Sequence, residues 1–108
     1  MDRGVLEKIK NVIYDVAGRY NIEIDRIILF GSRARGDHRE DSDWDILIVT
    51  KRKLDRDTFW DFYSSVKRSL ARVKIYGDLL VVSRSYYEEK RRNVGNISYY
   101  ATVEGKVL

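Results

Sequence analysis

The sequence predicts a fold of the α/β or α+β class, in which helices cover a small β-sheet. Three observations support this prediction. Segments with helical periodicity alternate with short apolar runs that are typical of buried strands. The 108 residues leave room for a single domain, residues 1–108, and an apolar fraction of 44% is enough for one core. No Pro and no Ser- or Gly-rich stretch marks a linker.

The first half of the chain contains one predicted helix and two predicted strands. Apolar residues three and four apart predict an amphipathic helix from Asp2 to about Tyr20, and Asn21 is expected to end it. The apolar run 26–30 predicts a buried strand that stops abruptly at Gly31 and Ser32. After the polar residues 33–42, a second strand is expected over residues 43–50.

The second half predicts helices on either side of a third strand. Asp55 can cap a helix, and Gly77 breaks the pattern before a strand over residues 78–82. Ser85 and Glu88 have the spacing of a capping box, so a helix is expected to start there. A last helix is expected from Asn96 to a stop at Gly105. The helix after Asp55 has a predicted core face made of Phe59, Phe62, Tyr63, Val66, Leu70 and Val73.

Composition excludes several classes of protein. No apolar run approaches the roughly 18 to 20 residues that cross a bilayer, and the N-terminus lacks the apolar stretch of a secretory signal. We therefore expect a cytoplasmic protein without a membrane partner. The absence of Cys excludes thiolate metal sites, and a single His argues against a His-built zinc site or a Ser-His-Asp triad. Catalysis would depend on carboxylates, hydroxyls, Lys or Arg.

Three acids stand in otherwise apolar strands. Asp43 and Asp45 are two residues apart, so strand geometry places both side chains on one face, about 7 Å apart. Trp44, Ile46 and Ile48 are expected on the opposite face. Asp78 opens the third strand. Carboxylates so close repel each other unless a cation lies between them, and Mg²⁺ prefers oxygen ligands. The three acids could hold a pair of metal ions.

The corner after the first strand has the properties of a phosphate site. Gly31 would let a phosphate approach the backbone, and Ser32 would add a hydroxyl donor. Arg33 and Arg35 are nearby cations, although they could equally be surface residues paired with acids in the polar loop. Together with the acids, the corner describes a nucleoside triphosphate held against metal ions, as in phosphoryl or nucleotidyl transfer.

The string GSRARGDHREDSDWDILIV puts ten residues between Gly31-Ser32 and the Asp43-x-Asp45 pair. This spacing resembles the nucleotidyltransferase superfamily that includes DNA polymerase beta, and specifically its minimal nucleotidyltransferases of the antitoxin type. The resemblance covers essentially the whole chain, including the Tyr-rich segment before the EGKVL tail. One departure is Gly77, where the family more usually has an apolar β-branched residue, and this suggests a looser third strand.

The resemblance implies a polymerase beta-like fold, with a small mixed β-sheet flanked by helices, and a Mg²⁺-dependent reaction. The α-phosphate of ATP, or of another nucleoside triphosphate, would be joined to an acceptor hydroxyl with loss of pyrophosphate. Asp43 and Asp45 would bind two Mg²⁺ ions and the triphosphate, and Asp78 would hold the metal that lowers the pKa of the acceptor hydroxyl. These three acids are thus the implied catalytic and metal-binding residues.

For the phosphates, the resemblance implies that the Gly31 backbone and Ser32 hold the outer groups, with Arg33 or Arg35 as auxiliary donors. Because 108 residues leave little room for an acceptor-binding domain, the acceptor is expected on another molecule. Minimal nucleotidyltransferases are often paired with a helical HEPN-domain ribonuclease toxin, which they neutralise by binding it and by adding AMP to a tyrosine. The first hypothesis is therefore an antitoxin that acts as a protein nucleotidyltransferase.

Two other functions and a homo-oligomer remain open. A non-catalytic module could neutralise its partner by contact alone, using exposed tyrosines and the basic second half, where residues 51–108 hold 13 basic and 7 acidic residues. Direct nucleic-acid binding is suggested only by the sequence pI of 9.4, without a recognition motif. The tyrosines in question could equally close the core; they are Tyr86, Tyr87, Tyr99 and Tyr100.

Overall fold

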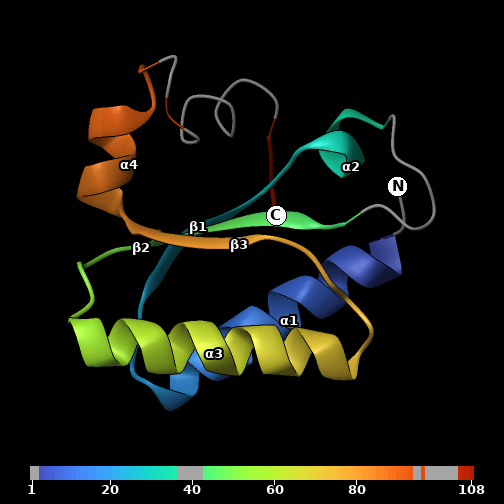
Figure 1. Ribbon diagram of the computed structural model, residues 1–108, viewed down its shortest axis with the longest axis horizontal. Helices are drawn as coiled ribbons and strands as arrows, with labels where there is room; N and C mark the ends of the chain where they lie inside the picture. Colours follow the sequence, from blue (N-terminus) through green and yellow to red (C-terminus); the bar gives the residue numbers. More distant parts are fainter. Residues whose placement is uncertain (1–2, 37–42, 94–95, 97–104) are drawn as a thin grey trace.

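The computed structural model describes residues 3–36, 43–93, 96 and 105–108, without the side chains of Arg3 and Ser32. Helices and strands alternate along the chain, as the sequence predicts (Figure 1). Their order is α1 (Arg3–Arg19), β1 (Ile24–Phe30), α2 (Ser32–Arg35), β2 (Asp45–Thr50), α3 (Arg56–Arg72), β3 (Leu79–Ser83), α4 (Arg84–Lys90) and β4 (Lys106–Val107).

The four strands form one mixed sheet in the order β3-β2-β1-β4. β1 is antiparallel to both β2 and β4, whereas β2 and β3 are parallel. The parallel pair needs a long connection between its strands, and α3 provides it. The sheet therefore has β3 at one edge and the short β4 at the other. The predicted fold class, a small mixed sheet flanked by helices, is confirmed.

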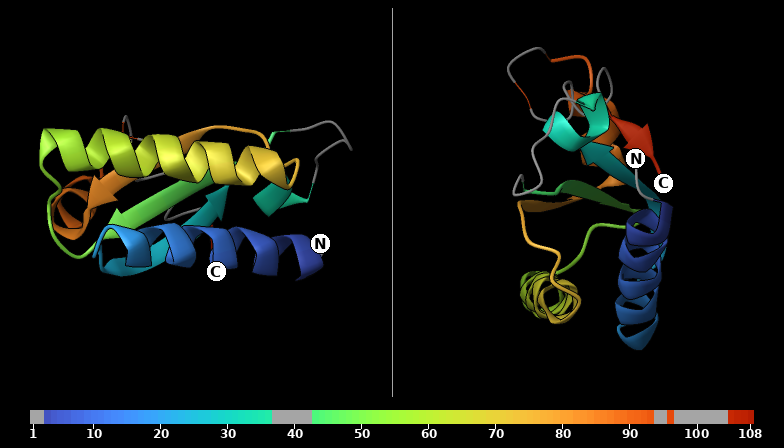
Figure 2. Two further views of the ribbon diagram at one scale, coloured as in Figure 1. Left: turned by 90° about the horizontal axis from the view of Figure 1, so that it is seen from below. Right: turned by 90° about the vertical axis from the view of Figure 1, so that its right-hand side faces the viewer.

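Helices α1 and α3 cover the same face of the sheet (Figure 2). The two helices contribute an apolar stripe each, at the three- and four-residue spacing seen in the sequence. The strands contribute alternate residues to the same layer. The fully buried members of this core are Ile9, Ile13, Val16, Leu29, Ile48, Phe62 and Val66.

The opposite face of the sheet carries α4, which lies across the ends of β2 and β3 (Figure 1). Its Tyr87 is 2% exposed and packs on Ile28, Phe30, Leu47 and Val49. Tyr87 therefore closes a second, smaller core.

Tyr86, the neighbouring residue on α4, is 40% exposed. Tyr99 and Tyr100 lie outside the described residues. Of the four tyrosines, one therefore serves the core and one remains available at the surface.

Two residues with positive φ end the long helices. Asn21 has φ 56° after α1, and the N–H of Ile22 returns to the carbonyl of Ala17. Lys74 has φ 61° after α3, and the N–H of Ile75 returns to the carbonyl of Leu70. Both ends satisfy helix carbonyls in the manner of a Schellman motif. The predicted stop at Asn21 is confirmed.

Several predicted boundaries change. β1 starts two residues earlier than expected, at Ile24, and β2 starts at Asp45, so Asp43 precedes it. The predicted start of the next helix at Ser85 is wrong. Ser83 is the N-cap, because its side chain accepts a hydrogen bond from the N–H of Tyr86. The last predicted helix falls mainly on residues 97–104, outside the described part.

Two further differences concern exposure and the C-terminal strand. Val73, predicted on the core face of α3, is 39% exposed because the helix has already ended there. β4 was not predicted; its Val107 is opposite Ile28 and its Lys106 is opposite Leu29. None of the helices in the described part has the length and apolar character required to span a membrane.

Candidate active site

The strand register brings Asp45 to the centre of the predicted site. Asp45 is the first residue of β2 and lies opposite Phe30, the last residue of β1. On its other side, the N–H of Ile46 donates to the carbonyl of Asp78 over 2.9 Å. Because Ile46 is in register with Leu79, Asp45 is in register with Asp78. Two acids that are 33 positions apart in the sequence thus lie side by side.

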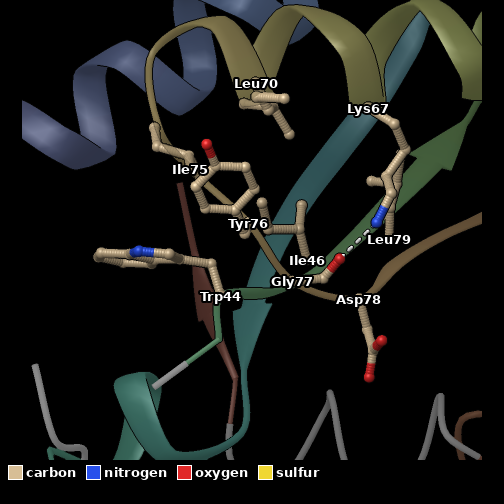
Figure 3. A pocket seen from close by; sticks show the side chains of 10 residues that line it. Trp44, Ile46, Lys67, Leu70, Ile75, Tyr76, Gly77, Asp78 and Leu79 are labelled. Atoms are coloured by element: carbon tan, nitrogen blue, oxygen red, sulfur yellow. Dashed lines mark hydrogen bonds between the residues drawn. The ribbon is translucent and has the colours of Figure 1, made fainter. Parts of the chain in front are cut away.

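Alternation along β2 decides on which face of the sheet Asp45 lies. Trp44 and Ile46 belong to the core beneath α1 and α3, whereas Leu47 belongs to the core beneath α4. Alternation therefore puts the side chain of Asp45 on the α4 face, with Asp43 two residues before it. Asp78 points away from the pocket under α3 (Figure 3). The predicted alternation on β2 is confirmed for Asp45 against Trp44 and Ile46, but the face of Asp45 also carries buried Leu47.

Electrostatics in the site centre on Asp45. Burial raises the pKa of its carboxyl, and the charges of Asp78 and then Asp43 raise it further. The charge of Arg35 lowers the same pKa by a smaller amount. Burial and two carboxylate neighbours thus disfavour the ionised form of Asp45, and a nearby positive charge would stabilise that form.

Gly31 joins the corner after β1 to this carboxylate. Gly31 has φ 75°, a conformation that side chains other than Gly rarely adopt. A Cβ at this position would collide with the carboxylate of Asp45. The carbonyl of Gly31 accepts hydrogen bonds from the N–H groups of Ala34 and Arg35, and these bonds close the single turn of the short helix α2. Only glycine allows the corner and the carboxylate to be this close.

The two arginines of α2 have different surroundings. The guanidinium of Arg33 lies over the Trp44 ring, 4.1 Å from its centroid, and therefore holds α2 against the start of β2. The side chain of Arg35 is exposed, and its positive charge lowers the pKa of Asp45. Of the two predicted phosphate donors, Arg35 thus acts on Asp45 through its charge, and Arg33 stacks on Trp44. The side chain of Ser32 and the polar residues 37–42 lie outside the described part.

Gly77 and Lys67 fix the backbone next to Asp78. A Cβ at Gly77 would collide with the backbone of Trp44, so this glycine lets the two chains run in close contact. Lys67 of α3 donates from Nζ to the carbonyl of Gly77 over 2.6 Å (Figure 3). The looser strand expected at Gly77 is therefore replaced by a tightly held one, with Asp78 next in sequence.

Sequence reasoning missed the roles of Lys67 and Trp44. In the sequence, Lys67 stands out only because it follows Val66 on the core side of a helix. A surface lysine whose stem packs on the core would have the same position, so this signal does not reveal the role of Lys67. Its hydrogen-bond acceptor lies ten residues later on a different element.

The donor set fits a divalent cation of the magnesium type. Such ions bind through one or a few carboxylates and complete their shell with waters and substrate phosphates. Asp43, Asp45 and Asp78 provide hard oxygen donors whose mutual repulsion a cation would relieve. In the described part of the chain, no group of three or more acidic or His side chains is arranged so that it could hold a metal ion by itself. The acids would therefore provide part of the coordination shell of such an ion, and waters and substrate phosphates would complete it.

The family model described as "Polymerase beta, Nucleotidyltransferase" matches residues 7–96. The chain belongs to this family. The matched range includes every predicted site residue, from Gly31 to Asp78.

Two relatives from Methanocaldococcus jannaschii carry the name of a candidate protein adenylyltransferase. One is 35% identical over 102 residues, which are 93% of this chain and 93% of the relative. The other is 47% identical over 47 residues, and that match spans only 44% of this chain and 48% of the relative. The chain is thus similar to one of them over nearly its whole length.

Solved structures agree with the fold. A candidate nucleotidyltransferase from Sulfolobus solfataricus superposes with a TM-score of 0.57 at 21% identity, over 99% of this chain and 87% of that one. A toxin–antitoxin complex with AMP-PNP gives 0.58 at 21% identity, over 90% and 69%. A complex of a tri-AMPylated Shewanella oneidensis HEPN toxin with its MNT antitoxin gives 0.51 at 19% identity, over 92% and 67%.

Proposed function

We propose that this nucleotidyltransferase moves AMP from ATP to a hydroxyl of a helical HEPN-type protein, as the antitoxin of a toxin–antitoxin pair. The observation that carries the proposal is the position of Asp45, which lies between Asp78 and Asp43 and against the backbone of Gly31. The names of the two archaeal relatives support adenylyl transfer to protein. The structural neighbours from toxin–antitoxin complexes support the kind of partner.

In this proposal, the corner and the acids have separate tasks. Backbone N–H groups near Gly31 and the hydroxyl of Ser32 bind the outer phosphates of the triphosphate. Arg35 offsets part of the negative charge that accumulates when pyrophosphate leaves. Mg²⁺ held by Asp43, Asp45 and Asp78 would supply charge neutralisation of the triphosphate and a lower pKa for the acceptor hydroxyl.

The reaction forms one bond and breaks another. The oxygen of the acceptor hydroxyl bonds to the α-phosphorus, and the bond from that phosphorus to the bridging oxygen of the pyrophosphate breaks. The hydroxyl proton leaves to solvent or to a site carboxylate, and pyrophosphate departs with the electron pair. Because the acceptor is on another molecule, the role of this chain is to hold the triphosphate in line with it.

The test is the intact mass of a co-encoded helical partner, before and after incubation with this protein, Mg²⁺ and each nucleoside triphosphate in turn. We expect a gain of one or more AMP units with ATP. Asp45→Asn should abolish the gain. Asp15→Asn removes an exposed carboxylate on α1 that pairs with Arg19, and it serves as a matched control with unchanged transfer.

Other outcomes would redirect the proposal. An unchanged partner mass together with a tight complex would favour a module that neutralises by contact alone. Undiminished transfer by Asp45→Asn would contradict the proposed site. Steep salt dependence of RNA or DNA affinity, with neither partner modification nor complex, would favour nucleic-acid binding.

A further inference from the structure

The edge strand β3 presents unpaired backbone groups. The carbonyl of Asp78 accepts from Ile46, and that of Val82 accepts from the hydroxyl of Thr50, so both face β2. By alternation, Leu79 and Val81 direct their N–H and C=O groups away from the sheet. No described residue pairs with these groups.

This edge lacks the devices that normally prevent strand pairing. Such edges usually carry Lys, Pro or a bulge. The strand sequence is LLVVS, with regular register against β2 throughout. An unprotected edge of four apolar residues and one Ser can therefore pair with another strand.

Beside the edge lies an apolar groove of about 320 Å³. Its walls are aromatic and aliphatic side chains from three elements. They are Phe59, Trp60 and Tyr63 of α3, Leu79 to Val82 of β3, and Tyr86 of α4. Trp60 is 54% exposed, which is unusual for the largest side chain. Aromatic residues at this exposure are typical of protein interfaces.

The edge is complementary to a second copy of itself. If two β3 strands pair antiparallel about a twofold axis at Leu80, Leu79 of one copy lies opposite Val81 of the other. These are the two residues whose backbone groups point outwards, so each such pair exchanges both hydrogen bonds. Leu80 then meets its own counterpart as a closely spaced pair.

The charges on α3 agree with the same twofold axis. Apart from Arg56 at its first position, the charged residues of its first half are the acids Asp57 and Asp61. Its second half carries Lys67, Arg68 and Arg72. An axis through β3 would run α3 antiparallel to its copy, because α3 lies beneath the same side of the sheet (Figure 2). The acidic half of each helix would then face the basic half of the other.

We propose that two copies of this chain associate through β3 and α3, joining their sheets into one. The occupant of the groove is thus the same groove of a second copy, an arrangement in which each contact occurs twice. This inference concerns assembly and needs neither nucleotide nor metal. Its failure would leave the proposed transfer reaction untouched, and loss of transfer would leave the dimer intact.

The test uses the absence of Cys in the chain. Leu80→Cys places a lone thiol on the twofold axis, so mild oxidation should yield a disulfide-linked dimer. Tyr14→Cys, at a 49% exposed residue of α1, is the control that should stay uncrosslinked. Sedimentation equilibrium of the unmodified chain should give a dimer.

A second pair of variants tests the groove without changing the strand. Trp60→Glu should weaken the dimer by at least about tenfold in dissociation constant, as expected for a central aromatic residue. Tyr14→Glu should leave the constant unchanged. A monomer at all concentrations, or a dimer that Trp60→Glu does not weaken and Leu80→Cys does not crosslink, would overturn the proposal. So would protection of the Leu79 and Val81 amides only after a different protein is added.

Discussion

At the scale of single residues, contacts between backbone and carboxylate define the site. Gly31 and Gly77 are placed where a Cβ would meet Asp45 or the backbone of Trp44. Each glycine thus brings one neighbouring segment to the start of β2. The sequence marks both as turn residues, and the structure explains them as sites of close approach.

Replacing Gly31 with Ala should destabilise the fold. The positive φ of this residue and the collision with Asp45 both disfavour a side chain, so we expect a loss of at least about 1 kcal/mol. Gly18→Ala, in α1 with open space around it, is the matched control and should gain about 0.5–1 kcal/mol. Urea unfolding measures both. Equal stability of the two variants would contradict the described contact.

Removing the charge of Asp45 should stabilise the metal-free protein. Its pKa is raised in the fold, so the ionised form is less favourable there than in the unfolded chain. Asp45→Asn should therefore raise the melting temperature at pH 7 in EDTA. The advantage should shrink as the pH falls through the raised pKa, and it should vanish below the ordinary value of 3.8.

Mg²⁺ should reverse the order of the melting temperatures of the unmodified chain and Asp45→Asn. Mg²⁺ with ATP should raise the melting temperature of the unmodified chain, since a ligand of the folded state stabilises it, and should have little effect on Asp45→Asn. A variant that is less stable than the unmodified chain in EDTA would show that the carboxylate is stabilising as it stands.

At the scale of elements, helix caps set where the helices begin. Asp55 accepts from the N–H of Thr58 over 3.2 Å and caps α3, as predicted. Hydrogen bonds from the side chain and the backbone of Thr58 lower the pKa of this carboxyl. The cap matters beyond α3, because this helix carries Lys67 to the carbonyl of Gly77.

Asp55→Ala should lower the melting temperature at neutral pH. Because the pKa is lowered in the fold, the contribution of Asp55 is complete above its ordinary value of 3.8 and is lost as the pH falls through the lowered value. The difference between the two proteins should therefore narrow in acid. Asp55→Asn keeps a capping oxygen without a titrating group, and it should be close to the unmodified chain at pH 7. A gap that widens in acid would contradict this assignment.

The start of α4 can be tested in the same way. The structure makes Ser83 the N-cap, so Ser83→Ala should cost about 1 kcal/mol. Ser85→Ala, two residues into the same stretch, should cost much less, although the two hydroxyls lie 3.1 Å apart. Denaturant unfolding of both variants distinguishes the observed cap from the capping box expected at Ser85. A larger loss of stability for Ser85→Ala than for Ser83→Ala would support the helix start at Ser85 that the sequence predicts.

At the scale of the whole molecule, stability should be highest in the two central strands. β1 and β2 are paired on both sides and lie between two apolar cores. We expect the amides of Ile46 to Val49 to exchange slowest with solvent, near the global unfolding limit. Leu79 and Val81 should exchange fast in a dilute monomer and slowly at concentrations where the proposed dimer forms. Uniform exchange rates across the sheet would contradict this distribution.

The sequence by itself determined the local features of this protein. Four features depend on residues within a few positions of each other. They are the helical periodicity, the stop at Asn21, the cap at Asp55 and the alternation that puts Asp45 and Ile46 on opposite faces of β2. The spacing from Gly31 to Asp45 is also local, which is why it indicated the nucleotidyltransferase family.

The tertiary structure alone decided what depends on contacts between distant segments. The register of β2 with β3 brings Asp78 to Asp45. Packing also stacks Arg33 on Trp44 and brings the charge of Arg35 to Asp45. The pairing of β4 with β1 and the bond from Lys67 to Gly77 belong to the same group. Such contacts form only when packing brings their elements together, and neither partner carries a local pattern that names the other.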